Sequence, residues 1–299
     1  MSIRVATFNV ENLFFRYKFR KNFDPTKQDG FSINNLAFAI NNETAKKITA
    51  ATIKAVDADI ICLQEVESLD ALDSFNSRYL GSKGYAHRIV IDSHDPRRID
   101  VAVLSRFPFS HINTHRHERN ASGKAWLFSR DCLEVDVNVD NKTLSLYINH
   151  LKSMMGGRSQ TKNRRLEQAN RVKDIINEWW KPGGYEGNFI VLGDMNDYPG
   201  DHTSLKSLID HPGLVNVVDR LPKSDRWTHY YAKKDDYSQL DYLLLSKSLA
   251  ESNKGLPGVE RRGLPTRAAR ATQARFKNVG KNNPKASDHC PLYMDLVLD

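Results

Sequence analysis

Carboxylate and amide side chains stand where several apolar runs of this sequence end. Asn9 follows VATF, Glu65 follows IICLQ and Asp194 follows FIVLG. Glu11 and Asn196 come two positions after Asn9 and Asp194. Oxygen ligands of this kind suit a hard cation, so we expect Mg²⁺, with Mn²⁺ as the alternative. Taken singly, each residue is more often part of a turn or a helix cap, and Asp194 in GDMNDYP has such a context.

Two histidines have neighbours suited to acid–base chemistry. His289, in SDHCPL, has Asp288 beside it, and Asp241 lies within the apolar run SQLDYLLLS. A carboxylate in such a strand is costly to bury unless it is paired, so we expect Asp241 to pair with His289. A carboxylate partner would fix the imidazole tautomer and stabilise its protonated form. The alternative for Asp241 is a surface position on an edge strand.

A further histidine, His150 in INHLKS, ends another apolar run and has Lys152 two residues on. We interpret most of the other histidines as ordinary surface or core residues. Together these residue types meet the needs of phosphate-ester hydrolysis. A cation and imidazolium groups would neutralise charge that develops on the phosphate oxygens, while a carboxylate aligns the attacking water.

The apolar runs that carry these residues predict an α/β protein. Short β-branched or continuous apolar runs predict strands, and most are expected to be buried on both faces. The predicted strands are 3–10, 59–66, 87–91, 100–106, 133–139, 144–151, 189–195, 239–246 and 291–298. Helical spacing predicts a helix from Glu43, and two more whose apolar faces cover the sheets. Those faces comprise Leu69, Leu72, Phe75 and Tyr79, and then Leu166, Ala169, Val172, Ile175, Ile176 and Trp179.

The 299 residues contain no internal repeat and no low-complexity linker, which favours one domain over 1–299. Two long segments have no clear assignment: an aromatic and basic insertion at about 15–42, and a basic loop at about 252–286. Long loops in a compact domain are usually functional or disordered. The insertion contains Phe15, Tyr17, Phe19, Phe23, Phe31 and Phe38, and we expect an apolar contact surface or a cover over the site.

The net charge of +8 comes from one region of the chain. Eight basic residues and no acidic residue lie between Arg261 and Ser287, and the rest of the chain carries 36 basic and 36 acidic residues. A localised positive field favours an anionic partner. Three widely spaced cysteines predict buried free thiols and a reducing compartment. No apolar run approaches the roughly 18 residues of a membrane span, so we expect a soluble cytoplasmic protein, and a monomer, without stable membrane insertion.

Seven short motifs, in order and nearly end to end, resemble the endonuclease/exonuclease/phosphatase superfamily, which includes deoxyribonuclease I-like enzymes. They are TFNVENL (7–13), LQEVE (63–67), DVAVLSR (100–106), NHLKS (149–153), GDMND (193–197), LDYLL (240–244) and SDHCP (287–291). The resemblance implies a four-layer α/β/β/α sandwich, two central mixed sheets flanked by helices, with the site at one end. It also implies a metal-dependent phosphoester hydrolase.

The resemblance assigns a role to each candidate residue. Asn9 and Glu65 would hold the metal, with Glu11 close by and Asp288 supporting the metal side or His289. Asp194 and Asn196 would position or activate the water and the phosphate. His289 with Asp241 would act as general base or as a partner of the phosphate charge. His150 would contact the transition-state oxygens or the leaving group, and Asp100 is the candidate to orient it.

The basic stretch favours a nuclease that cleaves DNA or RNA backbones, because Lys and Arg contacts to phosphates give affinity without sequence preference. Arg261, Arg262, Arg267 and Arg270 are the candidate phosphate-binding residues. The helix behind His150 carries more basic residues, for which a solvated face is an equal alternative. Two alternatives stay open: a phosphatase or phosphodiesterase of a phosphorylated lipid or small molecule, and a binding protein of the same fold without catalysis.

Overall fold

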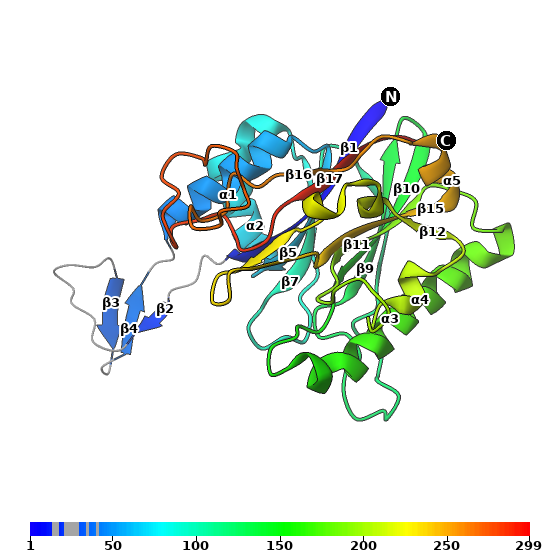
Figure 1. The fold of residues 1–299 in the computed structure, drawn as a ribbon, viewed down its shortest axis with the longest axis horizontal. Coiled ribbons are helices and arrows are strands. Elements are labelled where there is room, and N and C mark those ends of the chain that lie inside the picture. The colour runs from blue at the N-terminus through cyan, green and yellow to red at the C-terminus, as the bar shows by residue number, and fades with distance from the viewer. Residues whose placement is uncertain (14–17, 21–29, 34–35, 40–41) are drawn as a thin grey trace.

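Two six-stranded sheets form the centre of the protein, as a computed structural model shows for residues 1–13, 18–20, 30–33, 36–39 and 42–299 (Figure 1). The first sheet has the order β16 (Gly258–Val259), β17 (Leu292–Val297), β1 (Ser2–Leu13), β5 (Ile60–Val66), β7 (Asp100–Ser105) and β6 (His87–Val90). The second has the order β12 (Leu214–Asn216), β15 (Asp241–Ser246), β11 (Phe189–Asp194), β10 (Lys142–His150), β9 (Cys132–Val139) and β8 (Phe109–Thr114).

Each sheet is mixed because it contains one parallel pair among antiparallel neighbours. β1 runs parallel to β5, and β10 runs parallel to β11. A parallel pair needs a long crossover connection, which helices usually supply. Helix α1 (Glu43–Val56) lies in the connection from β1 to β5, and α3 (Arg158–Trp180) lies in the connection from β10 to β11. In each parallel pair, the first strand ends at the same edge of its sheet as the second.

Three hydrophobic clusters build the layers of the sandwich. Ile3 and Val5 of β1 pack between the sheets with Leu146 of β10, whereas the alternate residues Ala6 and Phe8 face outward. The outward face of the first sheet packs against α1 and α2 (Leu69–Phe75), and that of the second packs against α3 and α4 (Lys206–Ile209). Figure 1 shows α1 and α2 on one side of the sheets and α3 and α4 on the other. The predicted α/β/β/α sandwich is confirmed.

The remaining elements are short. They are the helix α5 (Lys247–Ser252), the hairpin β13 (His229–Tyr231) and β14 (Asp236–Ser238), and the small sheet of β2 (Lys18–Arg20), β4 (Leu36–Ala39) and β3 (Gly30–Ile33). A π-helical turn spans Asn76–Leu80, and 3₁₀ turns span Gly81–Lys83, Lys181–Gly183, Val217–Arg220 and Lys223–Asp225. These strands, together with β8, β12 and β16, were not predicted, because they are too short or too polar to form an apolar run.

The predicted helical faces are correct at their centres and wrong at their ends. Leu69, Leu166 and Trp179 are 42%, 37% and 60% exposed, although helical spacing placed them on the covering faces. Leu69 is the first residue of α2, and at the end of α3 the next residue, Trp180, stacks on Phe189 of β11 in place of Trp179. The interior residues Val172 and Ile176 are fully buried. Helical periodicity therefore identifies the centre of a buried face but not which residues at its margins are covered.

The three cysteines are buried free thiols, as predicted. Strands β7, β11 and β15 are buried at every position, but β17 alternates and β6 is half-buried, so burial on both faces holds only for the central strands. None of the described helices has the length and apolar character needed to cross a bilayer. In the insertion at 15–42, Phe15, Tyr17 and Phe23 lie outside the described residues, so the expected cover over the site stays a prediction.

Candidate active site

The predicted site residues meet at one edge of the sandwich because of the strand directions. Asn9, Glu65, His150 and Asp194 lie at the carboxyl ends of the four parallel strands. Strand β15 runs antiparallel to β11, so it begins at that same edge with Asp241 paired opposite Asp194. His289 lies three residues before the start of β17, which is antiparallel to β1. Segments separated by up to 280 residues of sequence thus contribute to one rim.

His289 and Asp241 form the expected pair, and a threonine orients it. The His289 Nδ1 lies 2.9 Å from Asp241 Oδ2. The Thr228 hydroxyl donates to the same carboxylate oxygen at 2.7 Å and accepts the backbone N–H groups of Leu240 and Asp241 at 3.1 Å each. Asp241 is fully buried, so the edge-strand alternative is wrong for this residue. The remaining ring nitrogen, Nε2, faces Asp194 Oδ2 at 3.7 Å.

Asp194 lies at the centre of the site, with Asn9, Asn196 and both imidazoles around its carboxylate. Its Oδ2 accepts hydrogen bonds from the side-chain amides of Asn9 at 3.1 Å and Asn196 at 2.9 Å. The backbone N–H of Asn196 donates to Asp194 Oδ1 at 2.9 Å. The His150 Nε2 lies 3.5 Å from Asp194 Oδ2. The carboxylate is thus held in one orientation from three directions while both imidazoles face it.

Burial and neighbouring charges separate the ionisation of these groups. Burial raises the pKa of Asp194 to about 7, against the opposing charge of His289. Burial disfavours the charged ring of His289, but the carboxylates of Asp241 and Asp194 outweigh burial and hold its pKa well above the ordinary value. Burial and the charge of Arg130 hold the pKa of His150 well below its ordinary value. At neutral pH one imidazole is therefore charged and the other is neutral.

Glu65 reaches the site through a β-bulge. The register between β5 and β7 shifts between Gln64 and Val66, and Glu65 adopts a left-handed backbone with φ of 68°. Without the extra residue, strand alternation would direct Glu65 toward the outer face, where Val66 packs. Left-handed φ values also occur at Glu11 (47°) and Asn196 (53°), and such backbone strain concentrates at functional sites.

Gly193 lets β10 and β11 approach closely next to Asp194. Its φ is 130°, and a Cβ added there would lie 2.0 Å from the backbone oxygen of Asn149. No side chain fits at that distance, so this position requires glycine. The close approach places His150 and Asp194, which are register partners across β10 and β11, at the same rim.

Glu65 and Asp288 are candidate cation ligands on the acidic side of the site. Glu65 Oε1 lies 3.4 Å from the Asn9 side-chain nitrogen and 4.0 Å from His150 Nε2, and these are long contacts for a buried carboxylate. Burial, reinforced by the charge of Asp288, raises the pKa of Glu65. Because the charge of Asp288 makes ionisation of Glu65 more costly, a positive charge beside the two carboxylates would offset this cost, so these residues fit a divalent cation.

The other two candidates for this side are already engaged with neighbours. Asn9 Oδ1 accepts the backbone N–H of Glu11 at 3.0 Å, and Glu11 forms an ion pair with Lys285. Burial raises the pKa of Glu11, and the charge of Asp288 adds to this effect. These contacts leave Glu65 and Asp288 as the primary candidate ligands, with Asn9 and Glu11 beside them.

Asp100 was expected to orient His150, but no hydrogen bond joins the two side chains among the described residues. Its Oδ1 accepts the backbone N–H of Ser93 at 3.1 Å, and its Oδ2 has no hydrogen-bond partner among the described residues. His150 Nδ1 likewise has none in that part of the chain. Arg130, which is 1% exposed, holds the end of β10 instead, because its Nε donates to the His150 backbone oxygen at 3.2 Å. Lys152 follows β10, and its backbone N–H donates to the side chain of Gln168 at 2.8 Å.

The four candidate phosphate-binding arginines all have partners within the protein. Arg261 lies over the Trp227 ring and donates to the Trp227 backbone oxygen at 2.9 Å, so it joins the basic loop to the segment before β13. Arg262 pairs with Glu260 of the same loop. The loop at 252–286 is ordered around a core that includes Leu264 and Ala268. Arg267 lines the hollow that contains Asp288 and also donates to Asn282 Oδ1 at 3.0 Å. Arg270 lies over the Tyr237 ring and lines a second hollow, which Arg261 lines as well.

One hollow joins the basic loop to the metal side of the site. It has a volume of about 340 Å³, and its lining includes Glu11, Asp288, Lys285 and Arg267. The hollow therefore begins at candidate metal ligands and continues along basic side chains. A substrate whose anionic groups extend beyond the reacting phosphate would find positive charge there.

Sequence reasoning missed three residues that shape the site. Thr228 orients Asp241, Arg130 supports His150, and His229 lies beside Asp288 with its ring centroid 4.7 Å from that of His289. Burial lowers the pKa of His229 to about 4, and the charge of His289 adds to this effect. The segment WTHYY, a polar pair among aromatic residues, was the available signal, but only its pairing with the chain around His289 gives it meaning.

A model of the Endonuclease/Exonuclease/phosphatase family matches residues 4–277. The chain belongs to this family, whose members are hydrolases of phosphate esters. No curated protein matches the sequence.

Solved structures of similar fold share little sequence with the chain. Truncated Caenorhabditis elegans TDP2 has 15% identity and a TM-score of 0.61, and the alignment covers 99% of this chain and 97% of that one. The human Nocturnin catalytic domain with bound sulfate has 17% identity and a TM-score of 0.64, covering 100% and 95%. The Bacteroides thetaiotaomicron mannosyl-6-phosphatase has 17% identity and a TM-score of 0.60, covering 99% of each chain.

Proposed function

We propose that this chain is a divalent-metal-dependent phosphodiesterase that cleaves the backbone of DNA or RNA. The observation that carries the proposal is the convergence of two imidazoles on the Asp194 carboxylate, beside the two candidate metal carboxylates. Hydrolysis of a phosphate ester requires an oriented water and positive charge on the phosphate oxygens. The site offers groups for both requirements.

The side chains divide this chemistry between them. Asp194, held by Asn9 and Asn196, aligns a water against phosphorus, and its raised pKa suits it to accept the water's proton. His289 keeps a proton on Nε2, which faces Asp194 and can donate to a phosphate oxygen. His150, as a neutral ring, lies on the other side of the same carboxylate. Water adds to phosphorus as one ester P–O bond breaks, and the leaving oxygen takes up a proton.

Glu65 and Asp288 would hold the metal, with Asn9 and Glu11 beside them. A bound divalent ion would offset the charge of these carboxylates and polarise a phosphate oxygen. Mg²⁺ suits the oxygen ligands, with Mn²⁺ as the alternative.

The choice of a nucleic acid rests on positive charge on two flanks of the site. Arg267 and Lys285 line the hollow that begins at Glu11 and Asp288. On the other flank, the half-exposed Arg97 lies close enough to His150 and Lys152 to lower the pKa of each, although burial is the largest cause and the buried Arg130 adds to it. A polymer with phosphates on both sides of the scissile one would meet both flanks, whereas a small ester would meet one.

A phosphatase or phosphodiesterase of a small molecule or lipid is the second candidate. It is favoured by the internal partners of Arg261, Arg262 and Arg275, which reduce the charge that the basic loop presents to a ligand. A protein of this fold without catalysis is the third candidate. It would retain the fold while failing to bind millimolar Mg²⁺ or Mn²⁺ in a calorimetric titration.

Nicking of supercoiled plasmid separates these functions. We expect nicking with Mg²⁺ or Mn²⁺, loss with EDTA, and loss in Asp194→Ala and His289→Ala. His202→Gln, a change at an exposed histidine outside the site, should nick normally. RNA, abasic oligonucleotide, phosphoinositides, sphingomyelin and sugar phosphates complete the panel. Hydrolysis of the small esters or lipids alone would replace the nuclease by the second candidate.

A further inference from the structure

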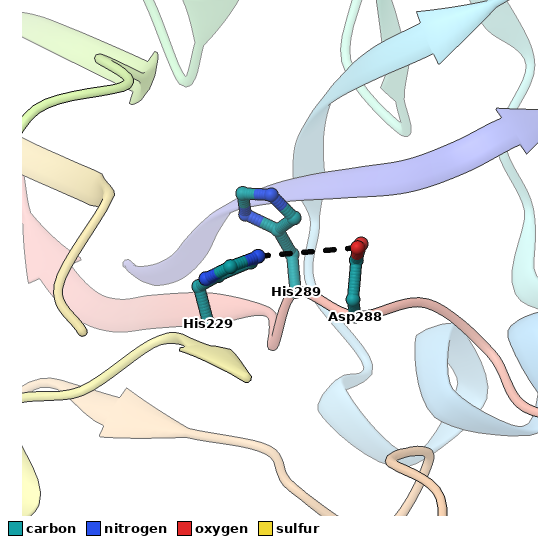
Figure 2. A group of neighbouring side chains, drawn as sticks. All are labelled: His229, Asp288 and His289. Carbon is teal, nitrogen blue, oxygen red and sulfur yellow. Dashed lines mark ion pairs between the residues drawn. The ribbon is translucent and has the colours of Figure 1, made fainter. Parts of the chain in front are cut away.

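His229 extends the acidic side of the site with a nitrogen donor. Its Nε2 lies 3.9 Å from Asp288 Oδ2. Figure 2 shows the His229 ring directed at the Asp288 carboxylate, with the His289 ring beside them. One donor atom from each of these three residues can be chosen so that all lie within 4.8 Å of one another. Such a group can hold a metal ion.

The 3.9 Å separation suits a shared cation better than a direct hydrogen bond. Hydrogen bonds between nitrogen and oxygen are about 2.7–3.2 Å long. Two ligands with bonds of about 2.1 Å to one ion lie about 3 Å apart at a right angle and about 4 Å apart on opposite sides. The His229 and Asp288 atoms fall within this span, so one ion could contact both without moving either backbone.

The backbone holds this pair of residues in place. The Tyr230 backbone N–H donates to the Asp288 backbone oxygen at 2.9 Å, and the Cys290 backbone N–H donates to the Thr228 backbone oxygen at 2.7 Å. His229 Nδ1 lies 3.3 Å from the Ser238 hydroxyl, which leaves Nε2 toward Asp288. A ligating histidine is commonly oriented in this way through its other ring nitrogen. His289 differs, because its Nδ1 is held by Asp241.

We propose that His229 and Asp288 ligate the metal of this centre, and that the imidazole makes the centre prefer a divalent transition-metal ion to Mg²⁺. Imidazole nitrogen binds Co²⁺ and Zn²⁺ well, whereas Mg²⁺ prefers oxygen ligands and retained waters. The inference rests on the proposed metal-dependent hydrolase, because it concerns the metal of the same site. Oxygen donors alone favour Mg²⁺, whereas the added nitrogen donor changes the expected ion to a divalent transition metal.

Calorimetric titration of the full chain with Co²⁺ and with Mg²⁺ tests the inference. We expect Co²⁺ to bind at least tenfold more tightly than Mg²⁺. His229→Gln should weaken Co²⁺ binding by about 10- to 100-fold and Mg²⁺ binding by less than about threefold. The matched control His202→Gln, which removes an exposed histidine, should bind both ions as the unaltered chain does.

Electron spin echo spectroscopy with bound Mn²⁺ supplies a second readout. Nitrogen modulation should be present in the unaltered chain and in His202→Gln, and lost in His229→Gln. Circular dichroism checks that each variant is folded. If His229→Gln does not fold, Ser238→Ala takes its place, and a several-fold loss of Co²⁺ affinity with unchanged Mg²⁺ affinity is then expected.

Unchanged Co²⁺ affinity in the folded His229→Gln variant would overturn the inference. So would a loss of hydrolysis with unchanged metal affinity, which would assign His229 to the substrate. The proposed function fails separately: a chain that binds Co²⁺ through His229 and hydrolyses no phosphate ester would leave this inference standing.

Discussion

At the scale of single residues, the site depends on relays in which one side chain fixes another. Thr228 accepts two backbone N–H groups and donates its hydroxyl proton to Asp241, and Asp241 in turn binds His289. Of these three residues, His289 alone faces the position of the phosphate in the proposed function. Asp241 and Thr228 are therefore positioning residues, and their effect on the reaction passes through the imidazole.

Substitutions along this relay should lower kcat in a graded way. Asp241→Asn removes the charge that keeps His289 protonated, so we expect kcat to fall by about 10²- to 10³-fold with little change in KM. Thr228→Val should cost about tenfold, and Thr228→Ser, which restores the hydroxyl, should recover most of it. Steady-state kinetics on the substrate identified by the panel measures these effects. Equal losses in Thr228→Ser and Thr228→Val would show that the methyl packing matters rather than the hydrogen bond.

At the scale of elements, strand ends and their irregularities aim the side chains. The bulge at Glu65 and the close approach at Gly193 are features of the backbone. They set the positions from which the side chains of the site extend. The two parallel pairs bring the carboxyl ends of β1, β5, β10 and β11 to one edge.

Gly193→Ala should damage both the fold and the site. A Cβ there would lie 2.0 Å from the Asn149 oxygen, and the φ of 130° is unfavourable for alanine. We expect the free energy of unfolding to fall by about 3 kcal/mol or more, measured by urea denaturation. Gly183→Ala is the matched control, because nothing lies within 4 Å of its added Cβ, and it should change stability by less than about 0.5 kcal/mol. A Gly193→Ala protein as stable as this control would contradict the close approach.

A charged cluster joins the segment after β8 to β9 and α3. His115 Nδ1 lies 2.9 Å from Glu118 and its Nε2 lies 3.4 Å from Glu134, while Arg171 of α3 also binds Glu118. Burial opposes protonation of the ring, but hydrogen bonds to the two glutamates raise the pKa of His115 to about 9.

The stability of the fold should therefore decline between neutral and alkaline pH. Because the folded pKa lies above the unfolded value of about 6.5, the contribution of His115 is complete below pH 6.5 and is lost as the pH rises through about 9. We expect a loss of about 1–2 kcal/mol, allowing for solvent screening of Glu118. Urea denaturation at pH 6 and pH 9.5 measures it. His115→Gln should remove this component, and the exposed His111→Gln should retain it.

At the scale of the whole molecule, the excess positive charge is divided between internal and external uses. Arg261, Arg262 and Arg275 hold the loop at 252–286 together, whereas Arg267 lines the hollow beside Asp288. A nuclease that binds backbone phosphates there should release counterions on binding, so its affinity should fall steeply with salt.

Arg267→Gln should weaken binding to a catalytically inactive background and reduce the salt dependence. In an Asp194→Ala protein, we expect the slope of log K against log salt to decrease in magnitude by about 1 when Arg267 is changed. Fluorescence anisotropy with a labelled duplex at several salt concentrations measures this. Lys206→Gln, in an exposed pair on α4, should leave the slope unchanged. An unchanged slope for Arg267→Gln would remove this residue from the proposed interface.

The sequence by itself determined the layered fold and most of the rim. Continuous apolar runs predicted the central strands, because strands buried on both faces need apolar residues at successive positions. The polar residue at the end of each run then predicted Asn9, Glu65 and Asp194 as site residues. Ordered motifs predicted the family, which the family match confirms.

Only the tertiary structure decided how these residues engage one another. Periodicity carries no information on a bulge such as that at Glu65, or on the pairing that brings His229 to Asp288 across about 60 residues of chain. It also could not show that Arg261 binds the backbone at Trp227 while Arg267 lines the hollow beside Asp288. The physical reason is that burial and charge pairing depend on contacts between distant segments, whereas sequence patterns report only the needs of each segment by itself.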